Sequence, residues 1–164
     1  MNKFKLPFLL AAIITLALGC DQAPVFPVEP QIEFLDISPK EVRNLRDSVV
    51  VRFRFQDGDG DLGRDSNAEN DLLLIDTRHE DIATLSRQDA TIGYSLMLLT
   101  PDARKPAIQG EISVTIPVVA VFPLPGNTED EVRYQIELRD RAGNLATGID
   151  GSTTIYTDYI RVYK

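Results

Sequence analysis

The chain has 164 residues, of which 43% are hydrophobic, with a formal net charge of −8 and one cysteine. The acidic balance argues against nucleic acid as a partner, because phosphate groups are bound by surfaces rich in Lys and Arg. A single cysteine cannot form a disulfide within the chain, so stability must come from packing, hydrogen bonds or bound ions.

Residues 1–19 have the order of an export signal. Lys3 and Lys5 precede the apolar stretch 6–18, and the small residue Gly19 follows it. As a helix this stretch would extend about 20 Å, less than the roughly 30 Å of a bilayer's hydrocarbon layer. We therefore predict a signal peptide that is removed, rather than a segment that spans the membrane.

Cys20 directly follows this signal. The run 17–20, Ala-Leu-Gly-Cys, resembles the lipobox of Gram-negative bacterial lipoproteins. The resemblance implies that Cys20 is lipidated and becomes the first residue of a protein anchored in the cell envelope. The predicted location is the outer membrane, on its periplasmic or surface face, although Asp21 leaves retention at the inner membrane open. An ordinary signal peptide is the alternative.

Residues 20–30 are predicted to be the lipidated cysteine and a proline-rich linker. Pro24, Pro27 and Pro30 recur at every third position. Proline fixes φ and removes a backbone donor, which favours an extended spacer on the order of 30 Å long. A plain disordered terminus is the alternative.

Residues 31–164 carry the patterns of β-strands. Hydrophobic and polar residues alternate over 49–56, 111–116 and 132–139, as in strands with one buried face. Less regular candidates are residues 32–37, 72–76, 94–99 and 155–163. About seven strands without a long amphipathic helix predict one all-β domain, an immunoglobulin-like antiparallel β-sandwich over 31–164. A short helical insertion is expected within 79–90.

The run 134–144, Tyr-Gln-Ile-Glu-Leu-Arg-Asp-Arg-Ala-Gly-Asn, supports this fold by resemblance. It is similar to the penultimate strand and following turn of fibronectin type III and other immunoglobulin-like domains. The resemblance implies that Tyr134 packs at a corner of the sandwich. It also implies that Asp140, Gly143 and Asn144 shape the turn into the last strand.

The run 57–61, Asp-Gly-Asp-Gly-Asp, is the best candidate site. Glycine permits the tight curl that turns several carboxylates toward one point. Ca²⁺ takes six to eight oxygen ligands, and carboxylates with loop carbonyls supply them. We predict a Ca²⁺ loop whose ligands are Asp57, Asp59, Asp61, Asp65 and Glu69. The alternative is a glycine-rich solvent turn that binds nothing.

This loop is not an EF-hand. Leu62 stands where that motif needs glycine, and Ala68 stands where it needs the bidentate Glu. In a Greek-key sandwich, however, the loop after the second strand and the loop after the sixth lie at the same end. Asp140 is therefore predicted as an additional ligand.

The sequence is compatible with two alternative functions, and we name no catalytic residue for either. The first is a lipid-anchored binding or structural module of the cell envelope, stabilised by Ca²⁺ and facing an unknown protein or glycan ligand. The alternative is a hydrolase of glycans that uses paired carboxylates. A cleft with two acids of shifted pKa would favour the hydrolase, whereas exposure of the apolar run 118–125 would favour the binding module.

Overall fold

The computed structural model describes residues 25–65, 69–99 and 107–164. The predicted signal peptide, Cys20 and the first part of the spacer lie outside these ranges. The described residues form β-strands and two short 3₁₀ helices, with no α-helix. None of their helices is long and apolar enough to cross a membrane.

The first layer of the fold is a four-stranded sheet with the order β6-β3-β1-β9. Its long strands pair antiparallel, and the short β9 runs parallel to β1. The strands are β1 (Gln31–Ser38), β3 (Val49–Asp57), β6 (Ile108–Ile116) and β9 (Thr147–Gly148).

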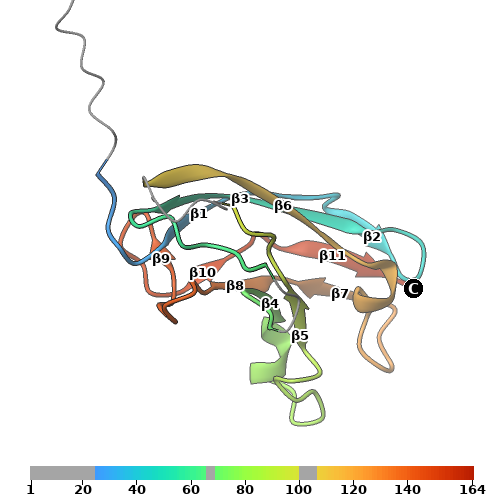
Figure 1. Ribbon diagram of the computed structural model, residues 1–164. Coiled ribbons are helices and arrows are strands. Elements are labelled where there is room, and N and C mark those ends of the chain that lie inside the picture. Colours follow the sequence, from blue (N-terminus) through green and yellow to red (C-terminus); the bar gives the residue numbers. More distant parts are fainter. Residues whose placement is uncertain (1–24, 66–68, 100–106) are drawn as a thin grey trace, which may run out of the picture.

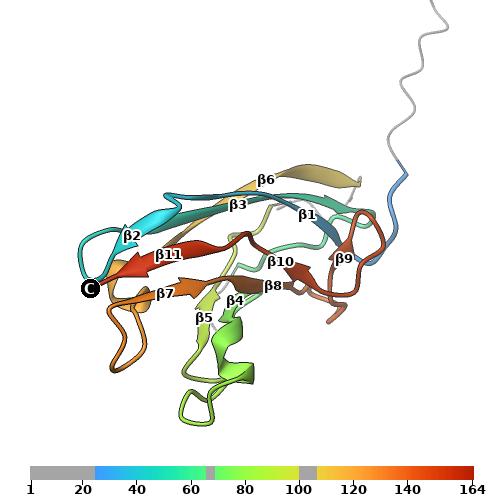
Figure 2. The same ribbon diagram turned by 180° about the vertical axis from the view of Figure 1, so that it is seen from behind.

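The second layer contains two hydrogen-bonded groups, with the orders β10-β8-β4-β5 and β2-β11-β7. They continue one another along the chain, since only Arg133 separates β7 from β8 (Figures 1 and 2). The strands are β2 (Glu41–Arg43), β4 (Leu72–Asp76), β5 (Thr91–Tyr94), β7 (Glu129–Val132), β8 (Tyr134–Leu138), β10 (Ile155–Tyr156) and β11 (Ile160–Tyr163).

The predicted all-β sandwich of immunoglobulin-like form is confirmed. The eleven strands of the described residues exceed the expected number because single long strands are interrupted. The first strand is divided at the cis peptide between Ser38 and Pro39, after which the chain leaves β3 and pairs parallel with β11. The last two long strands are divided into β7 and β8, and into β10 and β11.

The core lies between the two layers. Val51 and Phe53 are fully buried on the inner face of β3, whereas Arg52 and Arg54 are exposed on its outer face. The second layer supplies buried residues with the same period of two. They are Leu72, Leu74, Tyr134, Ile136 and Leu138. The alternation in the sequence therefore predicted the buried face of each long strand correctly.

The predicted strand over 94–99 is wrong. β5 ends at Tyr94, and residues 95–99 turn away from the sheet toward the loop that follows β3. There Arg64 donates its amide hydrogen to the carbonyl of Leu96 over 3.0 Å. Hydrogen bonds to that loop therefore replace the pairing that the apolar pattern suggested.

The helical insertion is present but begins earlier than expected, as the 3₁₀ helix η1 (Thr77–Glu80). Residues 77–90 lie on the outer side of the second layer (Figures 1 and 2). Ile75, near the end of β4, is fully buried but is not part of the core between the layers.

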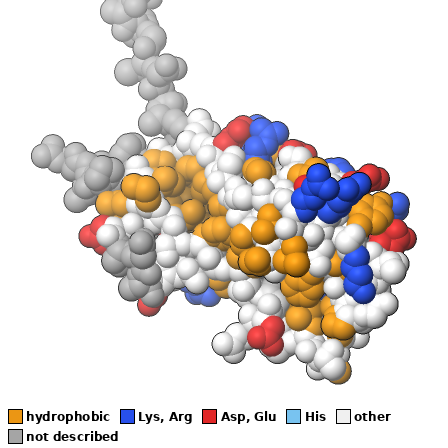
Figure 3. Space-filling view, turned by 90° about the vertical axis from the view of Figure 1, so that its right-hand side faces the viewer, with side chains coloured by type: hydrophobic (Ala, Val, Ile, Leu, Met, Phe, Trp, Pro, Cys, Tyr) orange, Lys and Arg blue, Asp and Glu red, His pale blue; other side chains and the backbone are white. Residues whose placement is uncertain are grey.

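The apolar run 118–125 is partly buried and partly exposed. It contains the 3₁₀ helix η2 (Val118–Ala120), after which Val121 and Pro123 are buried against the domain. Val119 is 67% exposed. Figure 3 shows hydrophobic side chains gathered in a band across one side of the molecule.

The spacer and the aspartate-rich loop lie at one end of the sandwich, and the C-terminus lies at the other (Figure 1). The chain enters at one end, and Lys164 lies at the other (Figure 1). The loops that follow β3 and β8 meet, because the amide of Arg141 donates to the carbonyl of Asp61 over 3.3 Å. The aspartate-rich loop therefore lies at the end where the spacer joins the domain.

Candidate metal centre

The loop over residues 57–65 begins as a direct continuation of β3, whose last residue is Asp57. Gly60 and Gly63 have φ values of 66° and 79°, which L-residues rarely adopt. Leu62 is fully buried in the core and anchors the middle of the loop. A buried anchor between two left-handed glycines makes the loop curl over the end of the sandwich.

The curl brings three carboxylates together. One oxygen from each of Asp57, Asp59 and Asp61 lies within 4.8 Å of the others. Asp57 is 0% exposed and Asp61 is 5% exposed. This spacing is compatible with one ion at the centre, since Ca²⁺–oxygen distances are 2.3–2.6 Å.

Two of the carboxylate oxygens in this triad are buried without a hydrogen-bond partner among the described residues. Oδ2 of Asp57 accepts a hydrogen bond from the amide of Leu62 over 3.2 Å. Oδ1 of Asp57 and Oδ1 of Asp59 are buried and have no hydrogen-bond partner among the described residues. Buried carboxylate oxygens are normally paired, hydrogen-bonded or bound to a metal. The buried triad can therefore hold a metal ion, and its all-oxygen donor set suits a hard cation.

The electrostatics of Asp57 lead to the same conclusion. Burial, and after it the nearby Asp59 carboxylate, raise the pKa of Asp57 to about 6. The backbone amides of Asp61 and Leu62 offset part of the effect. A divalent cation would stabilise the charged form that this environment penalises.

Two arginines form hydrogen bonds and ion pairs in and around the loop. Arg64 donates through Nε to Oδ1 of Asp71 over 2.5 Å and through Nη1 to Oε2 of Glu69 over 3.0 Å. Arg141 donates through Nη1 to the carbonyl of Gly63 over 2.8 Å. Both side chains therefore hold the loop and the groups beside it in place.

The other predicted ligands lie outside the triad. Asp65 and Glu69 are exposed, and Glu69 pairs with Arg64. Asp140 is fully buried, and Asn144 donates hydrogen bonds to both of its carboxylate oxygens over 2.7 Å. Asp140 therefore shapes the turn that supports the loop.

Sequence reasoning missed the buried acids of the second layer. Asp71 is 2% exposed and is held by Arg64, and Asp76 is held by Arg78 through three hydrogen bonds from Nε and Nη2. The only available signal was an acid at either end of the strand 72–76, which also fits ordinary strand termini.

Tyr134 is 1% exposed and belongs to the hydrophobic core of the sandwich. Its hydroxyl is buried and has no hydrogen-bond partner among the described residues. Burial also raises the pKa of this phenol. Tyr134 therefore contributes through the packing of its ring, and its hydroxyl forms no hydrogen bond with the described residues.

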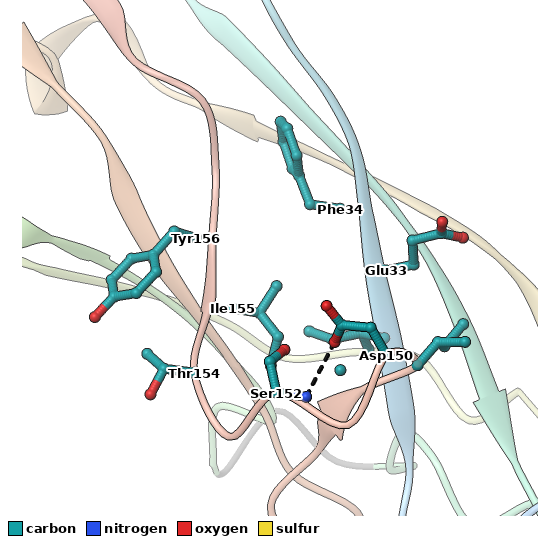
Figure 4. Close-up of a pocket in the computed structure, with 10 residues that line it drawn as sticks. Glu33, Phe34, Asp150, Ser152, Thr154, Ile155 and Tyr156 are labelled. Atoms are coloured by element: carbon teal, nitrogen blue, oxygen red, sulfur yellow. Dashed lines mark hydrogen bonds between the residues drawn. The ribbon is translucent and has the colours of Figure 1, made fainter.

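A separate cavity of about 550 Å³ lies between the edges of β1 and β10. Its acids are Glu33 and Asp150, with Phe34 and Ile155 among the other lining residues (Figure 4). Glu33 is paired with Arg54 over 2.9 Å, and hydrogen bonds from Ser152 lower the pKa of Asp150. A general acid needs a raised pKa, so this pocket gives the hydrolase reading no specific support.

The triad thus stands as a buried all-carboxylate cluster at the end of a β-sandwich. Comparison of the chain with protein-family models, with curated proteins and with solved structures gives no match.

Proposed function

We propose that this protein is a binding or structural module of the cell envelope, held there by a lipid on Cys20 and stabilised by Ca²⁺ in the loop after β3. The observation that carries the proposal is the buried triad of Asp57, Asp59 and Asp61. Such a cluster destabilises a domain unless a cation neutralises it. The ion makes one end of the sandwich rigid, so that its loops keep a fixed surface toward a protein or glycan ligand.

Ca²⁺ is the proposed ion because the triad offers only carboxylate oxygens, and backbone carbonyls of the loop complete a hard-donor shell. Zn²⁺, Cu²⁺ and Ni²⁺ would prefer imidazole or thiolate ligands. The three acids of the triad lie within a span of five residues, which suits the irregular coordination that Ca²⁺ tolerates better than Mg²⁺.

The decisive test is the thermal stability of the mature chain, residues 20–164, with Ca²⁺ and with a chelator. At a Ca²⁺ concentration of about 100 times Kd, binding to the folded state alone adds about 2.7 kcal/mol, which corresponds to roughly 5–10 °C in Tm. The double variant Asp57→Asn/Asp59→Asn should lose this response. Because it also removes buried charge, it should be more stable than the wild type in the chelator.

A charge-matched control separates the site from a general effect of acidity. Asp81→Asn/Asp158→Asn removes the same charge at two exposed positions outside the loop. This control should keep the full Ca²⁺ response. An equal response in all three proteins would remove the loop from consideration as the metal site.

The lipid anchor is tested independently of the metal. Metabolic labelling with a fatty acid should mark the wild-type chain and not Cys20→Ser. The wild type should fractionate with membranes, and the variant should lose that association. A soluble, unlabelled wild-type chain would refute the anchor while leaving the metal site untouched.

A further inference from the structure

The proposed metal loop is in direct contact with the spacer that joins the domain to its anchor. Gly58 lies between two residues of the triad and donates its amide hydrogen to the carbonyl oxygen of Pro27 over 2.8 Å. A Cβ added at Gly58 would collide with the carbonyl oxygens of Phe26 and Pro27. The spacer backbone therefore rests on the loop at a distance that only glycine allows.

The spacer is fastened to the domain at a second point. Pro30 is buried, and its carbonyl accepts the amide hydrogen of Thr147 over 3.1 Å. Between the two contacts Val28 is 54% exposed, and before them Val25 is 97% exposed. Among the described residues, the Pro27–Gly58 bond is thus the first point, counted from the N-terminal side, at which the spacer is hydrogen-bonded to the domain.

Cation binding and spacer docking act on the same few backbone bonds. Asp57 and Asp59 flank Gly58, and a cation that holds both carboxylates restricts the torsions of the residue between them. The carboxylate of Asp57 has a fully buried oxygen, Oδ1, without a hydrogen-bond partner among the described residues. A bound cation would compensate the cost of burying this oxygen. The Gly58 amide then points in one fixed direction, toward the carbonyl of Pro27.

We propose that a divalent cation in the triad locks the spacer onto the domain, so that Ca²⁺ sets how rigidly the domain is held relative to its anchor. This inference rests on the proposed metal site. With the ion bound, the spacer leaves the domain at residue 26 in a fixed direction. Without it, the chain is released as far as Pro30, which adds on the order of 10 Å of reach at about 3.1 Å per residue.

Thermodynamic linkage makes the proposal quantitative. If Ca²⁺ strengthens docking of the spacer by some factor, docking must strengthen Ca²⁺ binding by the same factor. Gly58 is not among the glycines with positive φ, so alanine fits its backbone and interferes only with the spacer. Gly58→Ala keeps all three carboxylates and should weaken Ca²⁺ binding about fivefold or more.

Hydrogen exchange on the wild-type mature chain tests the coupling without a variant. The Gly58 amide reports docking at the loop, and the Thr147 amide reports the second contact at Pro30. Ca²⁺ should slow exchange at Gly58 by about tenfold or more beyond any change at Thr147. In Asp57→Asn/Asp59→Asn, Ca²⁺ should leave both amides unchanged.

The outcomes separate this inference from the metal site itself. Calorimetry of Ca²⁺ binding to wild type and Gly58→Ala gives the affinities directly. Equal affinities, together with equal changes at Gly58 and Thr147, would overturn the lock and leave the Ca²⁺ site standing. Absence of Ca²⁺ binding to the wild type would overturn the metal site and the lock together.

Discussion

The guanidinium of Arg141, in the loop after β8, donates to the carbonyl of Gly63, in the loop after β3, over 2.8 Å. The backbone amide of Arg141 donates to the carbonyl of Asp61 over 3.3 Å. One residue from the opposite layer therefore binds two carbonyls of the proposed metal loop. The relationship connects the turn built around Asp140 with the triad, although Asp140 itself is not one of the three clustered acids.

Arg141→Ala should destabilise the domain by about 1–2 kcal/mol, because it removes the side-chain bond to Gly63 and leaves that carbonyl unpaired. It should also reduce the Ca²⁺ response, since the loop loses its brace. Arg139→Ala is the matched control, because Arg139 is exposed and its guanidinium donates to the carbonyl of Gly143 within its own loop. We expect the control to change stability by less than about 0.5 kcal/mol in urea unfolding. Equal costs for the two variants would contradict the bracing role.

Arg78 joins three parts of the second layer. It forms the fork-like pair with Asp76, bonds to Asp130 over 3.2 Å and donates to the carbonyl of Phe122. Its side chain is 11% exposed. Arg78→Ala should therefore cost about 3–5 kcal/mol, because two acids lose their partner in a largely dry site.

The control for Arg78 is Arg54→Ala, which removes a surface pair with Glu33 and should cost about 0–1 kcal/mol. Arg78→Lys should recover only part of the loss, since an ammonium group cannot bind two carboxylate oxygens and a carbonyl in one plane. Full recovery by lysine would mean that charge alone, rather than the fork geometry, holds these segments together.

Much of the fold was readable from local sequence. Alternation gave the buried faces of residues 49–56 and 132–139 because each strand packs one side against the core. The clustering of Asp57, Asp59 and Asp61 was readable for a similar reason, since glycines between acids allow a short loop to curl. These features depend on residues that are close in the chain.

What the sequence did not reveal depends on distant contacts. Residues 95–99 are apolar enough for a strand, yet they bond to the loop of Leu62 and Arg64. Gly58 looked like any turn glycine, and only the folded chain brings Pro27 against it. Asp71 and Asp76 pair with arginines only seven and two residues away, so it is their burial by the rest of the fold, rather than their pairing, that depends on distant contacts.

Tyr134→Phe should leave stability unchanged or raise it by up to about 1 kcal/mol. The hydroxyl is buried without a partner among the described residues, so its removal ends a desolvation cost and loses no bond. Tyr134→Ala should instead cost about 3–5 kcal/mol through the cavity that it leaves. Urea unfolding of the two variants compares these effects. A loss of more than about 1 kcal/mol in Tyr134→Phe would mean that the hydroxyl has a partner after all.

The stability of the metal-free protein should depend on pH through Asp57. Its pKa rises from 3.8 to about 6 on folding, so the folded state holds this proton more tightly than the unfolded state does. The contribution of this proton to the free energy of unfolding is complete below about pH 4 and is lost as the pH rises through 6, by at most about 3 kcal/mol.

In a chelator, the stability of the wild type relative to Asp57→Asn should therefore fall between pH 4.5 and 7.5. Saturating Ca²⁺ should reverse this trend for the wild type, because the ion requires the ionised carboxylate and is released as acid protonates it. Urea midpoints for both proteins across this pH range measure the difference. If the midpoints of the wild type and of Asp57→Asn in chelator change with pH in the same way, burial among acids does not raise the pKa of Asp57.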